Sequence, residues 1–90
     1  MPSPQKIIVI GAGIIGASIA WHLQRKGASV TTIAQKIGGE ATPNSFAWIN
    51  ASWGNPEFYF HFRHRSMAEW SRLAADLPGL PLSWCGGLCW

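Results

Sequence analysis

Three glycines in the pattern G-x-G-x-x-G, at Gly11, Gly13 and Gly16, constrain the fold of this chain more than any other feature. The β-branched run KIIVI at residues 6–10 precedes them and predicts a buried strand. The proline-free residues 14–26 follow them and predict a helix. A turn from strand to helix is the setting in which this glycine spacing binds dinucleotides. The pattern therefore predicts a nucleotide site at that turn.

Each glycine of the motif has its own expected role. Gly11 permits the tight turn, Gly13 lets a pyrophosphate approach the backbone, and Gly16 lets the helix lie close to the strands. The N–H groups at the helix start and the helix dipole favour an anion at the same place. The candidate pyrophosphate-binding residues are therefore those of the motif: Gly11, Ala12, Gly13, Ile14, Ile15 and Gly16.

A second strand is expected directly after the first helix. Gly27 suits a left-handed helix cap, and residues 29–34 are rich in β-branched side chains. Strand, helix and strand within some thirty residues make a βαβ unit. Because strands of a parallel sheet are normally covered on both faces, residues 6–10 are expected to form a central, fully buried strand. The fold class is α/β, a partial Rossmann-type unit.

The remaining chain is expected to hold a long loop, a second helix and a terminal strand. Residues 37–54 are rich in Gly, Thr, Asn and Ser and predict an irregular loop of the length that serves a site. Asn55 is expected to cap the second helix, with Pro56 in its first position and its end near Leu77. Residues 82–90 predict a bulged strand or a tight hairpin.

The second helix is expected to have two different sides. Its buried stripe would be Phe60, Met67, Trp70, Ala74 and Leu77. Its solvated side would carry His61, Arg65, Arg72 and Asp76. We expect no metal ligand at His61 or His64, and reduced, structurally inert thiols at Cys85 and Cys89.

Composition narrows the function classes. Ninety residues, 48% of them apolar and 12% charged, fit one small domain or a piece of a larger one, with more apolar surface than such a chain hides easily. The net charge of +3 comes from scattered Lys and Arg, which argues against a nucleic-acid partner. The apolar run 7–21 is too short to span a membrane and contains the glycine motif, so we expect a cytoplasmic protein.

One expected residue is missing from the nucleotide site. A carboxylate that binds the ribose normally follows the motif by about twenty residues, at the end of the second strand. Ala34 occupies that place, and the loss of a charged acceptor costs about 1.5 to 3 kcal/mol. Gln35 is a neutral alternative acceptor if the strand end shifts by one residue, and Glu40 is the nearest later carboxylate. The sequence does not decide between them.

The chain resembles the FAD-dependent oxidoreductases of the D-amino-acid oxidase type, which include glycine and sarcosine oxidases. The resemblance is carried by IIVIGAGIIGASIAWHLQRKGASVTTI, GGEATPNSFAWINASWGNP, SMAEWSRLAADLPGL and WCGGLCW. It covers nearly all of the chain but only the beginning of the family's fold, so residues 1–90 would be the N-terminal part of an FAD-binding domain without the substrate domain.

The resemblance also implies a cofactor and a reaction. FAD would be the cofactor, with its pyrophosphate on the glycine motif and loop contacts from Gly39, Ala41, Thr42 and Ser45. The reaction would move a hydride from a C–H next to an amine nitrogen to the flavin and leave an imine that hydrolyses. No residue here matches a catalytic acid, base or substrate anchor. A missing C-terminal half or a partner chain would have to supply them.

Two other functions compete with this one. One is a binding module without catalysis, a fragment that holds a nucleotide weakly or not at all, because two or three strands cannot cover both faces of a parallel sheet. The other is an NAD(P)-binding module, in which the missing acid and Lys36 would accommodate a 2′-phosphate. The loop after the second strand argues against the latter, because it resembles the flavoprotein continuation.

Overall fold

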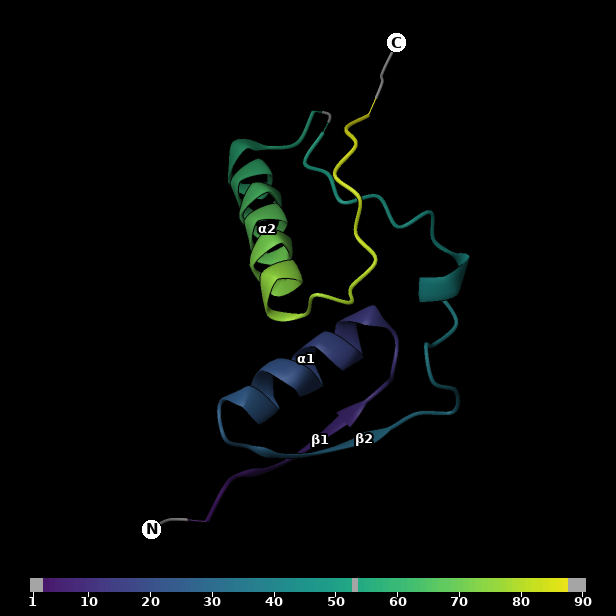
Figure 1. The fold of residues 1–90 in the computed structure, drawn as a ribbon, viewed down its shortest axis with the longest axis vertical. Coiled ribbons are helices and arrows are strands. Elements are labelled where there is room, and N and C mark those ends of the chain that lie inside the picture. Colours follow the sequence, from purple (N-terminus) through teal and green to yellow (C-terminus); the bar gives the residue numbers. More distant parts are fainter. Residues whose placement is uncertain (1–2, 53, 88–90) are drawn as a thin grey trace. The chain divides into compact units, whose positions relative to one another are not determined.

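The chain forms two compact units, Met1–Ala47 and Trp48–Trp90 (Figure 1). The computed structural model describes residues 3–52 and 54–87. The elements are β1 (Lys6–Ile10), α1 (Ile14–Arg25), β2 (Ser29–Ile33), the short 3₁₀ helix η1 (Thr42–Asn44) and α2 (Glu57–Asp76). Among the described residues, no helix has both the length and the apolar character that a membrane span requires.

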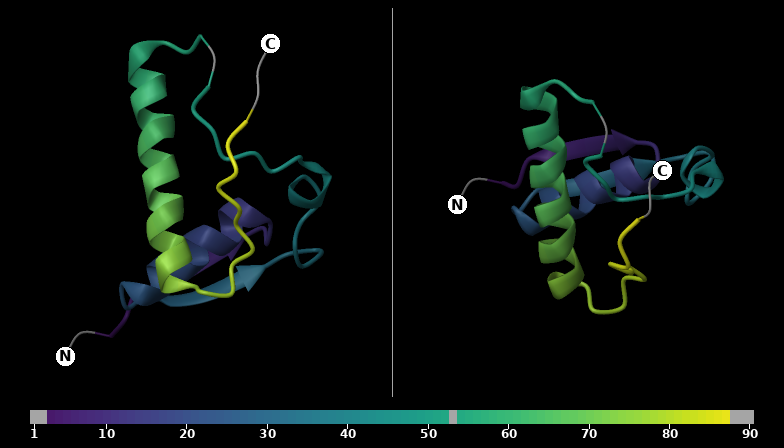
Figure 2. Two further views of the ribbon diagram at one scale, coloured as in Figure 1. Left: turned by 45° about the horizontal axis from the view of Figure 1, so that its top comes forward. Right: turned by 90° about the horizontal axis from the view of Figure 1, so that it is seen from above.

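The first unit is the expected βαβ arrangement. Strands β1 and β2 pair in parallel, from Lys6 opposite Ser29 to Ile10 opposite Ile33, and α1 connects them. Helix α1 packs against one face of this sheet (Figure 2). Parallel neighbours need such a crossover, because a tight hairpin can join only antiparallel strands. The structure confirms the predicted α/β class and the predicted strands to within one residue.

Helix α1 ends as its sequence predicts. The N–H of Ala28 donates to the carbonyl of Leu23 at 3.1 Å, and the N–H of Gly27 donates to that of Gln24 at 3.0 Å. This pair of bonds is a Schellman motif, which requires a left-handed residue after the cap. Gly27 fills that position with φ of +92°. The glycine therefore turns the chain directly from α1 into β2.

The sheet is covered on one face only, which contradicts the prediction that β1 is buried on both. Val9, on the side of α1, is the one buried apolar residue of the described chain, with 8% of its surface exposed. Side chains alternate between the faces of a strand, so Ile8 and Ile10 point the other way, as does Ile33 opposite Ile10. Ile8, Ile10 and Ile33 are 63%, 84% and 53% exposed, because α1 covers only the opposite face of the sheet.

In the second unit, α2 begins one residue later than predicted and without the predicted cap. The Asn55 side-chain amide donates to the carbonyl of Ser52 at 3.1 Å, and no side chain caps the helix. Pro56 lies at the N-cap position, where its carbonyl accepts from the N–H groups of Tyr59 and Phe60, both at 2.9 Å. Asn55 was wrong as a cap because its amide is used in the preceding turn.

No residue of the predicted stripe of α2 is fully buried. Met67, Trp70, Ala74 and Leu77 are of intermediate exposure, whereas Phe60 is 40% exposed. Arg63 ties the helix to the preceding loop, because its guanidinium donates to the carbonyl of Ser52 at 3.2 Å and to that of Asn50 at 3.0 Å.

The long loop is as predicted, whereas the described part of the chain end is not. Residues 37–52 and 54 are irregular apart from η1, as predicted for this loop. Within this loop Ala47 has φ of +54°, and its N–H donates to the Ser45 hydroxyl at 3.0 Å. Residues 81–87 have no regular structure, so the predicted terminal strand is wrong over 82–87. Residues 88–90, with Cys89, lie outside the described part. Cys85 is a free, exposed thiol.

Candidate functional site

The glycine turn lies at the carboxyl ends of both strands. The N–H of Gly11 donates to the carbonyl of Ile33 at 2.8 Å, which joins the end of β1 to the end of β2. Gly11 has φ of +111°, a backbone conformation that L side chains rarely adopt. A Cβ at Gly16 would lie 2.8 Å from the Gly11 carbonyl carbon. Gly11 and Gly16 therefore shape the turn and let α1 approach it closely.

The loop after β2 folds back onto this turn. The N–H of Gly38 donates to the carbonyl of Ala12 at 2.9 Å. A Cβ at Gly39 would come within 3.0 Å of the Gly13 Cα, so the two backbones touch. A Cβ at Gly13 would in turn come within 2.9 Å of the Thr42 hydroxyl oxygen. The loop after β2 thus packs its glycine pair directly against the turn.

The start of α1 is where an anion would be held. The N–H of Ile14 donates to the Thr42 hydroxyl at 2.9 Å, and the N–H of Ala17 makes the first helical bond, to Gly13, at 2.9 Å. Helix geometry leaves the amides between them, those of Ile15 and Gly16, without intrahelical acceptors. Together with the helix dipole, two such amides suit a phosphate oxygen.

The position that the sequence predicts to contact the ribose carries no carboxylate. Ala34 is the first residue after β2 and is exposed, next to the glycine turn in the strand register. Gln35 and Glu40 are also exposed, and no side-chain hydrogen bond ties either of them to the turn in the described part of the chain. The contact made by Glu40 is through its backbone carbonyl, which accepts from the Asn44 side-chain amide at 2.6 Å.

The structure brings together only some of the sequence-predicted loop residues. Gly39 and Thr42 lie against the turn, as described above. Ala41 is exposed at the start of η1, and the Ser45 hydroxyl accepts from the Ala47 N–H. Sequence reasoning missed Gly38, whose amide anchors the loop to Ala12. The signal was the Gly-Gly pair itself, because adjacent glycines permit close backbone approach.

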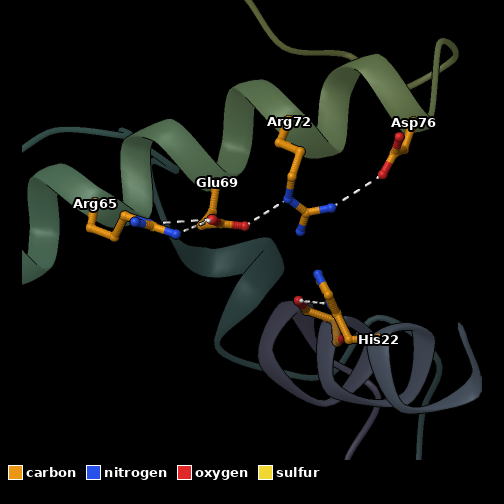
Figure 3. A network of polar contacts seen from close by, with 6 residues as sticks. His22, Arg65, Glu69, Arg72 and Asp76 are labelled. Atoms are coloured by element: carbon orange, nitrogen blue, oxygen red, sulfur yellow. Dashed lines mark hydrogen bonds and ion pairs between the residues drawn. The ribbon is translucent and has the colours of Figure 1, made fainter. Parts of the chain in front are cut away.

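A network of ion pairs lies along α2, away from the glycine motif in the sequence (Figure 3). The Glu69 carboxylate lies 3.3 Å from the Arg65 guanidinium and 2.8 Å from that of Arg72, and Arg72 lies 3.2 Å from Asp76. The hydrogen bond from Arg72 lowers the pKa of Glu69, with smaller contributions from the charges of Arg72 and Arg65, while desolvation opposes the shift. Arg65, Arg72 and Asp76 are exposed, as predicted, and Glu69, of intermediate exposure, lies with them on the same side of the helix.

Two histidines make local contacts. In α1 the Nδ1 atom of His22 donates to the carbonyl of Ser18 at 2.7 Å (Figure 3). In α2 the Nε2 atom of His61 lies 3.5 Å from the Glu57 carboxylate, one helical turn away. Within residues 3–52 and 54–87, no three His, Cys, Asp or Glu side chains group closely enough to hold a metal ion. The glycine turn therefore remains the candidate site.

Comparison with known proteins gives this turn a context. The family model described as FAD dependent oxidoreductase (DAO) matches residues 6–90. The chain is 40% identical over 67 residues to the uncharacterized oxidoreductase YurR of Bacillus subtilis, across 74% of this chain and 16% of that protein. It is 34% identical over 73 residues to a glycine oxidase of Bacillus licheniformis, across 78% of this chain and 20% of that protein.

A third relative carries a different description from the first two. The chain is 38% identical over 65 residues to the tRNA 5-methylaminomethyl-2-thiouridine biosynthesis bifunctional protein MnmC of Hydrogenovibrio crunogenus, across 64% of this chain and 10% of that protein. The chain thus spans between a tenth and a fifth of the relatives named here. No solved structure matches it significantly.

Proposed function

The chain belongs to the DAO family of FAD-dependent oxidoreductases, and from this premise we propose that it is the N-terminal part of an FAD-binding domain in an enzyme that oxidises amines or amino acids. The observation that carries the proposal is the loop seated on the glycine turn, where Gly39 contacts Gly13 and the amides of Ile15 and Gly16 lack helical acceptors. Family membership sets FAD above the NAD(P) alternative.

The residues of the turn fit a diphosphate. The missing Cβ atoms at Gly13 and Gly39 let the loop lie directly against the turn, and the amides of Ile15 and Gly16 would donate to phosphate oxygens. At the ribose, Ala34 supplies no acceptor, which leaves Gln35 as the adjacent polar side chain. The work of this chain would be to bind and orient the cofactor, with Ala41, Thr42 and Ser45 on the flanking loop.

The substrate class is supported by the names of two relatives. Glycine oxidase and the 5-methylaminomethyl-2-thiouridine biosynthesis protein are both named for compounds with a C–H beside an amine nitrogen. FAD, when bound, would supply the hydride acceptor for such a C–H, and water would hydrolyse the resulting imine. We assign no acid, base or substrate anchor to residues of this chain.

A second function is a nucleotide-binding fragment without catalysis. It is favoured by the coverage of a single sheet face, with Val9 the one buried apolar residue of the described chain. Such a fragment would hold FAD or its adenosine diphosphate half at the same turn. Binding alone therefore does not separate the two functions, whereas turnover of an amine by the FAD-loaded chain does.

The first test is whether the purified chain retains flavin. We expect flavin absorbance that survives gel filtration and a rise in melting temperature with FAD, since a ligand at one hundred times its Kd adds about 2.7 kcal/mol of stability. A colourless chain that is stabilised by NADP but not by FAD would overturn the FAD assignment.

A matched pair of variants localises the binding. Gly13→Ala adds a Cβ within 2.9 Å of the Thr42 hydroxyl, whereas a Cβ at Gly54 meets nothing within 4 Å. We expect Gly13→Ala to weaken FAD binding at least about tenfold, or about 1.4 kcal/mol, and Gly54→Ala to leave it unchanged. Equal affinities for the two variants would place the flavin away from the glycine turn.

A further inference from the structure

We infer that Thr42 is a positioning residue that caps helix α1 from a distance of 28 residues in sequence and thereby determines which amides at the helix start remain open to an anion. The inference goes beyond the proposed function, because the cap is a property of the protein without ligand. It rests on the proposed function only in its last step, the effect on FAD affinity.

Helix α1 lacks the side chains that usually accept hydrogen bonds from the first amides of a helix. Its N-cap residue is Gly13, which has no side chain, and its first turn contains no acidic residue. Helices normally use a Ser, Thr, Asp or Asn at the N-cap for this purpose. The Thr42 hydroxyl supplies the missing acceptor from another loop, at 2.9 Å from the Ile14 nitrogen.

The position of Thr42 is fixed by main-chain contacts on both sides. Before it, the Gly38 amide is bonded to the Ala12 carbonyl, and Gly39 touches Gly13. After it, the N–H of Ser45 donates to the Thr42 carbonyl at 3.2 Å and closes η1. Thr42 is thus held between a backbone anchor and a short helix, and its hydroxyl reaches α1 through the space that a Cβ at Gly13 would fill.

The cap divides the amides at the helix start into two sets. Ile14 is satisfied within the protein, by Thr42. Ile15 and Gly16 have no intrahelical acceptor and remain for a ligand. We therefore assign Ile14 to the cap and Ile15 with Gly16 to the anion. A hydroxyl-free residue at position 42 would leave the Ile14 amide without a partner and loosen the first turn of α1.

The test measures hydrogen exchange of single amides by NMR in the chain without ligand. In the wild-type chain the Ile14 amide should be better protected than the amides of Ile15 and Gly16. In Thr42→Val the exchange of Ile14 should be about five- to tenfold faster, and in Thr42→Ser it should return to the wild-type rate. Thr31→Val removes a hydroxyl from an exposed position in β2 and should change none of these rates.

Each outcome decides the inference. It is overturned if Ile14 exchanges as fast as Ile15 in the wild-type chain, a comparison that does not require any variant to fold, or if Thr42→Ser fails to restore protection that Thr42→Val removes. An FAD titration then tests the last step, with about fivefold weaker binding expected for Thr42→Val and recovery for Thr42→Ser. Protection of Ile14 without any FAD binding would refute the proposed function and retain the cap.

Discussion

At the scale of single residues, the motif glycines are required for unlike reasons. Gly11 is required by its backbone conformation, because φ is +111° while a Cβ there would meet nothing within 4 Å. Gly16 is required by contact, because a Cβ there would run into the carbonyl group of Gly11. Gly16 does not have a left-handed backbone conformation, so a substitution there tests only how closely α1 packs on the turn.

We expect Gly16→Ala to lower the free energy of unfolding by about 1 to 3 kcal/mol, because the added methyl group must displace backbone. The gain in helix propensity, about 1 kcal/mol, offsets part of this loss. Urea denaturation followed by circular dichroism measures the difference. Gly79→Ala is the control, since a Cβ there meets nothing within 4 Å. Equal stability of the two variants would contradict the close approach of α1.

Ala34 is the residue at which the site departs from the usual ribose contact. Ala34→Glu should tighten FAD binding by about tenfold to a hundredfold, since a hydrogen bond to a charged acceptor contributes about 1.5 to 3 kcal/mol. Calorimetric titration with FAD measures the change. Ala68→Glu adds the same charge at an exposed position of α2 and should have no effect. No gain in a chain that binds FAD would show that position 34 does not face the ribose.

At the scale of elements, α2 is organised by its charged side chains. Glu57 lies in its first turn, where it complements the dipole, but its last turn has no basic residue. Arg72 lies between Glu69 and Asp76 and forms an ion pair with each. All of these pairs lie within one helix and are exposed, so each adds little to stability on its own.

The pH dependence of Glu69 follows from this network. Its pKa is lowered from the usual 4.5, chiefly by the hydrogen bond from Arg72, so folding favours the ionised form. The stabilisation is therefore present above pH 4.5 and is lost as the pH falls through the lowered pKa. A carbon-detected NMR titration should give a Glu69 midpoint below that value.

The variants Arg72→Gln and Lys26→Gln separate the local from the general charge effect. Arg72→Gln should raise the Glu69 midpoint, because it removes the principal partner. Lys26→Gln removes the same charge from the end of α1 and should leave the midpoint where it is. A midpoint that does not respond to Arg72→Gln would show that the ion pair is not formed in solution.

At the scale of the whole molecule, many large apolar side chains of the chain remain exposed to solvent. Ile8, Ile10 and Ile33 lie on the sheet face away from α1 and are each more than half exposed. Both strands also have one edge without a neighbour in the described structure. Open edges beside an apolar face promote association between chains.

We therefore expect self-association of the chain that increases with concentration, and we expect Ile10→Thr to reduce it. Sedimentation velocity over a range of concentrations measures the effect. Ile37→Thr is a demanding control, because Ile37 is 95% exposed, more than the 84% of Ile10, but lies in a turn outside the sheet. If both variants reduce association equally, general hydrophobicity and not the sheet face is responsible.

The sequence predicted the elements well and their burial poorly. Glycine punctuation and hydrophobic period located β1, α1 and β2 to within one residue, because these signals are local. The cap at Asn55 and the strand over 82–87 were wrong, because each depends on neighbours that sequence spacing does not reveal. Burial of β1 failed for the same reason, since it requires an element on the second face.

The candidate site, like the fold, was predicted in part, and the contacts between residues distant in sequence were missed. The motif placed Gly11 and Gly16 at the turn, and family resemblance placed Gly39 and Thr42 beside it. The bond between Ile14 and Thr42 spans 28 residues, and no pattern within either segment indicates it. Gly38 was missed although the Gly-Gly pair signals a close backbone approach, because its partner, the main-chain carbonyl of Ala12, carries no residue signature.

The bond between Thr42 and Ile14 also sets an order of events during synthesis. Ile14 leaves the ribosome long before Thr42, and β1 leaves it long before its parallel partner β2. Until then α1 can form its internal bonds, which takes about a microsecond, but its first amide has no acceptor from the protein. The first amide of α1 therefore has no acceptor from the protein while the whole βαβ unit is translated. It gains one only after residue 42 has been synthesised.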